Sequence, residues 1–390
     1  MEKLLCAPSE LLVKIFEFLP ASDLASLAKT CRRFRDVVAI DQIWHDLCQK
    51  NYKVSSLDGW PLTSYKELYA IVLHRYGCIL GLWKLEVLYY GALIYVHVQN
   101  GKIIAENCCP PFDCSHLADP LRLKPLFEIS IENKTVKTTC VTGLHTHHDG
   151  IVKVNSTKRC QAEGFTFLCS KADWHNIKPV QSQNIGYLQQ WLVEEYNDGN
   201  IFSTSPHLIH LILSRYAAMH NIYSSNLRFN RLSIPSTVGH NDSIVLPGIY
   251  KGTYSSHGIE LIMVCDCKDR ILGTKITGDP NVPSGEITFD VDLTYPLEEG
   301  EEDNGSSVPS NNKKHPFHLP TGYFGEIPTH LKYYVRKFKG VGRIANTGFV
   351  SPQWTNNILY VFEKNEFGIL WTELRAFAMF RRTEEEFLQN

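Results

Sequence analysis

Short runs of alternating apolar and polar residues, separated by tight-turn signals, fill most of the chain after Cys78. The segment "ALIYVHVQNGKIIAENC" holds Asn100-Gly101 between two such runs, and "LFEISIENKTVKTTCV" holds Asn133-Lys134. Asn-Gly between two such runs is the strongest short-range signal for a hairpin, and the second segment repeats the pattern. Six further runs are "GIYKGTY", "GIELIMVCD", "RILGTKITG", "EITFDVDLTY", "NNILYVFEK" and "FGILWTEL". Consecutive hairpins predict an antiparallel sheet, and closing the sheet into a barrel removes its exposed edges.

The amino-terminal part of the chain shows helical periodicity instead. Pro8 suits a first helical position, and apolar residues then recur on one face up to a Leu-Pro turn. A second helix follows the turn, and Asp41 begins a third. The next helical pattern, "SYKELYAIVLHRYG", leads to Gly77, a residue typical of helix carboxyl-terminal caps. We predict a three-helix unit over 1–52 and a helical linker over 53–78.

Two segments interrupt the strand pattern. The helical patterns "IGYLQQWLVEEY" and "PHLIHLILSRYAAMH" predict a helical insertion over 185–220. The segment 297–316 is acidic, then rich in Gly, Ser and Asn, then basic, which predicts a flexible loop. The predicted fold class is therefore α+β, with the three-helix unit followed by one large antiparallel β-barrel domain over 79–390 that carries helical insertions.

Charge and composition exclude several classes of partner. The net charge of -2 gives no basic field that would attract nucleic acid or an anionic membrane. No apolar run reaches the roughly 18–20 residues of a membrane span, and Glu10, Lys14 and Glu17 interrupt any signal-peptide pattern. Without a secretion signal, the 12 cysteines are expected as reduced thiols or metal ligands. These features predict a cytoplasmic and nuclear protein that binds neither nucleic acid nor membranes.

The amino-terminal helices carry more apolar residues than about 50 residues of helix can bury by themselves. They must pack either on the large domain or on another protein. The stretch "APSELLVKIFEFLPASDLASLAKTCRRFRDVVAIDQIWHDL" resembles the F-box throughout its length. In that family the surplus apolar face binds the Skp adaptor, which joins it to the cullin scaffold and RING subunit of a ubiquitin ligase. The positions that the resemblance assigns to adaptor binding are Pro8, Leu11, Leu12, Ile15, Phe16, Leu19, Leu24, Leu27, Cys31, Phe34 and Trp44.

The remainder of the chain is similar to the F-box only protein 31 family. The similarity is carried by "LHRYGCILGLW", "DPLRLKPLF", "PGIYKGTYSSHGIE", "GTKITGDPNVPSG" and "FGILWTEL". Members of this family are substrate receptors of Skp–cullin–F-box ligases and promote proteasomal degradation of clients such as D-type cyclins. Their β-barrel binds the carboxyl-terminal end of the client, and amidated carboxyl termini are among the ends it accepts. The resemblance implies the same role here, in the cell cycle and the DNA-damage response.

Cysteine and histidine are concentrated in the segment 140–175. This window holds three cysteines and four histidines, more than twice the number that the composition of the chain would give. Structural zinc takes four Cys or His ligands, often as two short-spaced pairs. Cys140 with His148 and Cys169 with His175 form such pairs, and their spacing is similar to the zinc pattern of the family.

Other ligands in the same window stay open, because Cys160, His145 and His147 are competing candidates. Four protein ligands leave no open position for water, so zinc is expected as a structural cofactor that orders a long loop.

A receptor for a chain end needs polar groups that converge on the terminal carboxylate or amide. Two segments, "KGTYSSHGIE" and "GTKITGDPN", are dense in such groups. Lys275 could pair with a carboxylate, and Asp279 could accept a hydrogen bond from an amide or orient the lysine. Turn residues such as those of "TGDPN" also occur for steric reasons alone. The candidate client-binding residues are Tyr254, Ser255, His257, Lys275, Thr277, Asp279 and Arg343.

Catalysis is not expected. Ser255, His257 and Asp279 could be drawn as a hydrolase triad, but no G-x-S-x-G elbow surrounds either nearby serine, and no P-loop is present. Two alternatives to a degradative receptor remain open: a lipocalin-like barrel that binds a small molecule, and an adaptor that docks folded partners without sending them for ubiquitination.

Overall fold

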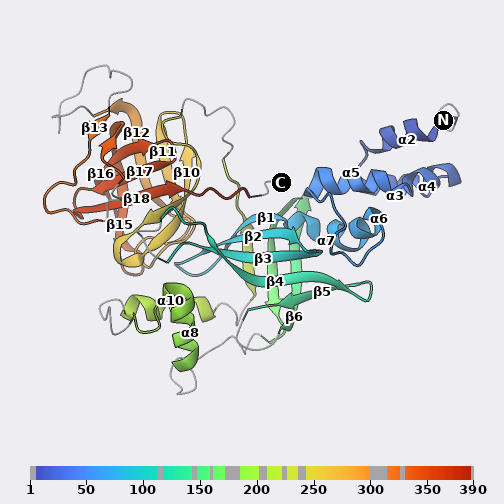
Figure 1. Cartoon of the computed structure of the whole chain (residues 1–390), viewed down its shortest axis with the longest axis horizontal. Helices are drawn as coiled ribbons and strands as arrows, with labels where there is room; N and C mark the ends of the chain where they lie inside the picture. Colours follow the sequence, from blue (N-terminus) through green and yellow to red (C-terminus); the bar gives the residue numbers. More distant parts are fainter. Residues whose placement is uncertain are drawn as a thin grey trace.

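The computed structural model of the chain describes residues 6–112, 117–142, 147–158, 161–171, 185–201, 209–221, 226–235, 243–297, 314–325 and 330–387. In these ranges no helix is both long enough and apolar enough to cross a bilayer. Figure 1 shows the amino-terminal helices, in blue, at one end of the molecule and the orange and red strands at the other. The blue-green strands lie between them, so three units follow one another along the long axis.

The amino-terminal unit contains four helices where three were predicted. They are α2 (Ser9–Phe16), α3 (Ala21–Leu27), α4 (Arg32–Val38) and α5 (Asp41–Tyr52). The predicted second helix is split at Cys31, whose backbone is extended and whose Sγ accepts a hydrogen bond from the Phe34 N–H at 3.4 Å. The prediction of a continuous helix is wrong because Cys31 caps α4, although its spacing also fits a helical face.

The linker is helical, as predicted, but it is not one regular helix. It consists of α6 (Tyr65–Leu68), a π-helical turn η1 (Tyr69–Leu73), α7 (His74–Tyr76) and a 3-10 turn η2 (Gly77–Ile79). Gly77 has a right-handed φ of -58° and therefore does not form a left-handed cap. Its missing side chain instead admits the Tyr52 ring, because a Cβ at this position would lie 2.4 Å from Tyr52 Cε1.

The helices and the first group of strands share one apolar core. Buried residues of the core run from Leu12 in α2, through Trp44 and Tyr69, to Trp83 in the first strand. The rings of Trp44 and Tyr69 lie 5.3 Å apart, which packs α5 against η1. The amino-terminal helices are thus fixed to the strands by packing and not by a flexible tether.

The strands form two closed antiparallel barrels of eight strands each. The first barrel contains β1 (Gly81–Leu85), β2 (Ala92–Gln99), β3 (Lys102–Cys109), β4 (Arg122–Glu132), β5 (Thr135–Cys140), β6 (His148–Lys158), β7 (Gln161–Cys169) and β8 (Leu227–Arg231). The second contains β9 (Gly248–Thr253), β10 (Ile259–Asp266), β11 (Arg270–Lys275), β12 (Ile287–Pro296), β15 (Arg336–Asn346), β16 (Val350–Glu363), β17 (Glu366–Trp371) and β18 (Ala376–Arg382). A small ribbon pairs β13 (His315–Pro316) with β14 (Tyr333–Tyr334).

The antiparallel barrel class is confirmed, but the prediction of a single barrel over 79–390 is wrong. The first barrel closes where β8 pairs with β1, and the second closes where β18 pairs with β9. A barrel of eight strands has an interior that side chains can fill, whereas one barrel of all these strands would enclose a wide lumen. Stacked rings supply this filling, with Phe165 and Phe229 4.3 Å apart in one barrel and Phe367 and Phe380 4.9 Å apart in the other.

The two barrels pack on each other through buried apolar side chains. These are Leu82, Leu93, Cys108 and Leu121 from the first barrel, and Ile249, Leu261, Met263 and Ile276 from the second. Two backbone hydrogen bonds also join them: the Gly278 N–H donates to Tyr90 O at 2.7 Å, and the Ser284 N–H donates to Tyr89 O at 2.8 Å. The turn that follows β11 is therefore part of the contact between the barrels.

The predicted insertion is present as α8 (Ile185–Tyr196) and α10 (Ile209–Asn221). These helices share a small core of their own and are tied to β4, since Arg122 Nη1 donates to Glu194 O at 2.8 Å. Most of the predicted flexible loop, residues 298–313, lies outside the described residues.

Candidate functional site

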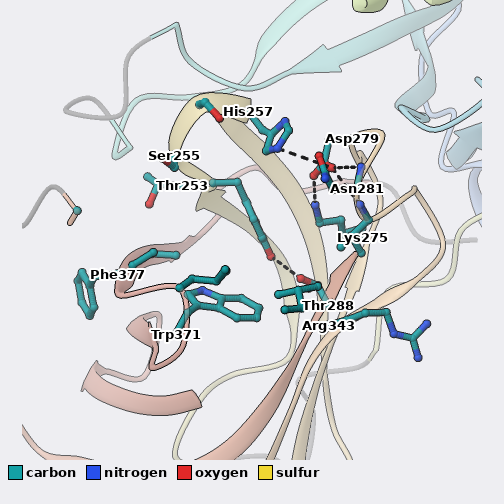
Figure 2. A pocket seen from close by; sticks show the side chains of 18 of the residues that line it. Thr253, Ser255, His257, Lys275, Asp279, Asn281, Thr288, Arg343, Trp371 and Phe377 are labelled. Carbon is teal, nitrogen blue, oxygen red and sulfur yellow. Dashed lines mark hydrogen bonds and ion pairs between the residues drawn. The ribbon is translucent and has the colours of Figure 1, made fainter. Parts of the chain in front are cut away.

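A cavity of about 710 Å³ opens at one mouth of the second barrel. Six of the seven residues predicted to bind a client line this cavity: Tyr254, Ser255, His257, Lys275, Asp279 and Arg343. They come from three places in the sequence, namely the β9–β10 turn, the end of β11 with its following turn, and β15. Figure 2 shows most of these side chains around the opening.

Thr277 is the one candidate that does not line the cavity. Its Oγ1 accepts a hydrogen bond from the Leu261 N–H at 2.8 Å, so the side chain supports the neighbouring strand β10. Alternate residues of a bend can point to opposite sides, and spacing alone could not show which side Thr277 takes.

Lys275 is the centre of a buried charge cluster on the wall of the cavity. Only 1% of its surface is exposed. Its Nζ lies 2.5 Å from Asp279 Oδ2 and 2.7 Å from Glu260 Oε2, and 4.2 Å above the centre of the Tyr254 ring. Asp279 Oδ1 also accepts the N–H groups of Asn281 and Val282, at 2.6 and 3.0 Å. Both partners of the ammonium are thus acidic side chains of the protein itself.

The two carboxyl groups of the cluster titrate differently. Burial raises the pKa of Glu260 to about 8, although Lys275 beside it acts in the opposite direction. Burial would also raise the pKa of Asp279, but the Lys275 ammonium and the hydrogen bonds of the cluster lower it to about 2. At neutral pH the cluster therefore holds one ammonium, one carboxylate and one protonated carboxyl group, so its net charge is zero.

The other titratable groups at the cavity add no free positive charge. Burial lowers the pKa of His257, and its Nε2 lies 3.9 Å from Asp279 Oδ1, beyond hydrogen-bond length. Arg343 is bound to Glu286 and stacks 4.5 Å above the Trp354 ring. In Figure 2 its guanidinium points away from Lys275 and Asp279. The cations that line the cavity in the described residues are therefore already compensated.

The apolar wall of the cavity was not found by the sequence reasoning. It consists of side chains from β17, from β18 and from the segment after β13, among them Trp371, Phe377 and Phe324. On the opposite wall the hydroxyl groups of Tyr254 and Thr288 lie 3.1 Å apart. The alternation of a strand shows which residues are apolar, but it does not show which end of the barrel is open. The strand pattern "FGILWTEL" was the only available signal.

Three of the four predicted zinc ligands converge. The donor atoms of Cys140, His148 and Cys169 all lie within 4.8 Å of one another, and all three side chains are buried. The strands β5, β6 and β7 are neighbours, and Cys140 is directly opposite His148 in their register. Cys169 Sγ lies 3.7 Å from His148 Nδ1, close to the roughly 3.5–3.8 Å between ligands in a tetrahedral zinc site. The donor set present fits zinc.

The other candidates for the metal lie apart from this cluster or outside the described residues. His147 is exposed and precedes β6. His175, the predicted fourth ligand, lies outside the described residues, and so do Cys160 and His145.

The residues predicted to bind the adaptor divide into three groups by exposure. Leu12, Phe16, Leu24 and Trp44 are buried in the core, and Leu19, Leu27, Cys31 and Phe34 are half-buried. The exposed group is Pro8, Leu11 (53%) and Ile15 (45%). Phe18, which was not among the predicted positions, exposes 81% of its surface at the end of α2. An exposed apolar strip of this kind marks a protein–protein contact.

Comparisons with known proteins agree with this architecture. An F-box-like family model matches residues 8–50, and a model described as the cyclin D1 binding domain matches residues 229–386. F-box only protein 31 of Mus musculus is 32% identical, over 98% of this chain and 85% of the relative. The chain belongs to the F-box only protein 31 family. The Homo sapiens protein of this name is 29% identical, over 98% of this chain and 84% of its own length.

F-box only protein 31-B of Xenopus laevis is also 29% identical, over 98% of this chain and 84% of the relative. The F-box match coincides with α2–α5, and the cyclin D1 binding match begins in β8 and spans the whole second barrel. The cavity with its charge cluster therefore lies inside the cyclin D1 binding match.

Glu260 gives the stability of the protein a pH dependence whose sign can be derived. The folded state keeps its proton up to about pH 8, whereas an unfolded glutamate releases it near pH 4.3. The free energy of unfolding is therefore expected to fall by about 1 kcal/mol between pH 7 and pH 8. In Glu260→Gln this fall should disappear. Urea unfolding at the two pH values measures it.

The control is Glu128→Gln, a partly exposed glutamate of β4 that pairs with Lys102. It should keep the wild-type fall in stability. An identical pH profile for Glu260→Gln and the wild-type protein would contradict a protonated Glu260.

Proposed function

We propose that this protein is the substrate-recognition subunit of a Skp–cullin–F-box ubiquitin ligase. Its F-box helices bind the Skp adaptor, and the cavity of the second barrel binds client proteins. The observation that carries the proposal is the pairing of an exposed apolar strip on α2 with a lined cavity in the cyclin D1 binding match. The receptor acts without catalysis of its own, by holding client lysines near the charged ubiquitin carrier.

The clients that this reading favours are D-type cyclins or proteins that resemble them in a carboxyl-terminal segment, and the outcome is proteasomal degradation. The site of action is the cytoplasm and nucleus, where the adaptor, the cullin scaffold and the RING subunit would join the receptor. A reconstituted ligase tests this: client-dependent ubiquitin transfer is expected. A complex that binds the client but transfers no ubiquitin to it would favour the non-degradative adaptor instead.

Substitutions on α2 test the adaptor contact. The double substitution Leu11→Asp/Ile15→Asp should weaken Skp binding at least hundredfold, because it places two charges in the exposed apolar strip. Both residues lie outside the buried core, so the fold should be kept. Calorimetric titration with the adaptor measures the affinity, and circular dichroism checks the fold.

The matched control is Lys50→Asp, which changes an exposed residue of α5. Leu12→Asp is not suitable as a test because it would place a carboxylate in the core. Adaptor affinity retained in the double variant would sink the proposed contact.

The cavity favours a neutral chain end, such as a carboxamide, over a free carboxylate. A carboxylate would bring one negative charge to a buried cluster of zero net charge, where Lys275 already has two acidic partners. A carboxamide adds no charge, and its N–H groups can donate to Asp279 or to the nearby hydroxyl groups. The apolar wall with Trp371 and Phe377 would take the side chains that precede the chain end.

One short client-like peptide in three forms tests this reading. The form that ends in a carboxamide should bind at least tenfold more tightly than the form that ends in a carboxylate, a difference of about 1.4 kcal/mol. The third form, extended by several residues, should also lose affinity because the added residues would have to displace the buried charge cluster on the polar wall. Fluorescence anisotropy with the adaptor–receptor complex gives the three affinities. Equal affinity for all three would mean that recognition is internal to the peptide.

A lipocalin-like function receives less support. A barrel that stores a lipid needs an apolar lumen, whereas stacked aromatic rings pack the interiors of both barrels. The described cavity lies at the mouth of the second barrel and has a buried charge cluster on its wall. A lipid that co-purifies with the protein would reverse this preference.

We further propose structural zinc at Cys140, His148 and Cys169, with His175 as the fourth ligand. Zinc here would pin β5, β6 and β7 to the chain that follows β7. Cys169→Ser should lower both the zinc content and the melting temperature. The control Cys108→Ser changes a cysteine that is equally buried but lies between the barrels. Cys108→Ser should keep the wild-type zinc content even if its melting temperature changes. Elemental analysis that finds full zinc in Cys169→Ser would rule out this ligand set.

A further inference from the structure

Glu260 lies behind the cavity and does not line it. It lies on β10 in alternation with Ile262 and Val264, which belong to the core of the second barrel, and only 3% of the residue is exposed. Its Oε2 nevertheless lies 2.7 Å from the Nζ of Lys275, which does line the cavity. Glu260 can therefore influence a bound chain end through Lys275, and through Asp279, with which it also interacts.

The two carboxyl groups that share Lys275 have different surroundings. Asp279 receives the ammonium at 2.5 Å and the backbone N–H groups of Asn281 and Val282. These three donors, together with the protonated carboxyl group of Glu260, favour the ionised form of Asp279. Glu260 is buried away from water, and the Asp279 carboxylate lies beside it; both favour the protonated form of Glu260, against the effect of the Lys275 ammonium. Asp279 is therefore the ionised counter-ion of Lys275, and Glu260 is a second carboxyl group that keeps its proton.

A protonated carboxyl group next to an ammonium can ionise when the first counter-ion is lost. Without Asp279 the ammonium would be buried and uncompensated, which is strongly unfavourable. Glu260 can remove this penalty by releasing its proton to solvent, after which the pair of Lys275 and Glu260 is neutral again.

We propose that Glu260 is a positioning residue and the reserve counter-ion of Lys275. It ionises whenever Asp279 is neutralised, and it keeps the ammonium from pairing with a charged chain end in the cavity. A carboxylate that enters the cavity must then displace Glu260, which takes up a proton from solvent as the new ion pair forms. The inference rests on the proposed chain-end site for its effect on clients, but the proton chemistry belongs to the receptor alone.

The groups that face Glu260 leave it as the residue that titrates just above neutral pH. They are Lys275 at the end of β11, Asp279 in the following turn, and Tyr254 and His257 at the β9–β10 turn. The pKa of His257 is lowered by burial and that of Tyr254 is raised well above its ordinary value by burial. Neither changes charge between pH 7 and pH 8.5.

The test compares Asp279→Asn with Asp279→Asn/Glu260→Gln, each in complex with the adaptor. Asparagine keeps the oxygen that accepts the Asn281 and Val282 N–H groups, so the turn can be retained. The probe is the peptide that ends in a free carboxylate. At pH 8.5 the double variant should bind it at least tenfold more tightly, because no ionised Glu260 competes for Lys275. The difference in affinity between the two variants should be smaller at pH 6.5, where Glu260 takes up a proton more easily.

Equal affinity of the two variants at both pH values would overturn the proposal. With Asp279 intact, Glu260→Gln should change the affinity for the carboxylate peptide by a smaller factor than it does in Asp279→Asn, since Asp279 still pairs with the ammonium. An equal factor in both backgrounds would likewise show that Glu260 acts independently of Asp279, against the proposal. Glu128→Gln in the Asp279→Asn background controls for a Glu-to-Gln change outside the cluster.

A measurement without any peptide separates this inference from the proposed function. In Asp279→Asn, Glu260 is expected to be ionised already at pH 7, so the fall in unfolding free energy between pH 7 and pH 8 should vanish. A fall that persists in Asp279→Asn would overturn the proposal even if no peptide binds. Equal affinity of the wild-type receptor for the carboxamide and the carboxylate peptide would refute the chain-end site. The pH dependence of the unfolding free energy would then still test the role of Glu260.

Discussion

The turn that follows β11 connects the two most important contacts of the molecule. The backbone N–H groups of Gly278 and Ser284 in this turn donate hydrogen bonds to the first barrel. The side chain of Asp279, in the same turn, accepts a hydrogen bond from the ammonium of Lys275. The same few residues therefore fix the second barrel on the first and shape the polar wall of the cavity. A disturbance of the contact between the barrels would move the charge cluster, and a disturbance of the cluster would loosen the contact.

The shared apolar core gives the F-box and the cavity a defined relation. Packing is continuous from Leu12 through the linker to the first barrel, and the second barrel is docked on the first by buried side chains and backbone hydrogen bonds. Figure 1 shows the resulting order of helices, first barrel and second barrel along the molecule. A receptor built in this way presents the client at a set distance from the adaptor, which the transfer of ubiquitin to particular lysines requires.

Sequence periodicity is sufficient to predict the strands and hairpins, but it does not predict how the sheets close into barrels. Asn100-Gly101 and Asn133-Lys134 sit in hairpin turns with positive φ, as the residue types Asn and Gly predict, whereas Lys134 takes this conformation without such a preference. The pairing of β8 with β1 joins residues far apart in sequence, and no local pattern encodes it, so periodicity alone does not separate two barrels from one. The site shows the same division. Local segments indicate Lys275 and Asp279, whereas Glu260 lies in the mostly apolar strand β10, where no local pattern marks it as part of the site.

The neutral charge cluster has a consequence for the kinetics of recognition. A binding site with a net charge accelerates the approach of an oppositely charged partner, and added salt slows that approach. The Lys275 cluster has no net charge to exert such an attraction, because its ammonium is balanced within the protein. Ionic strength should therefore have little influence on how fast a client reaches the cavity. Discrimination between clients would then reside in how long each one stays bound.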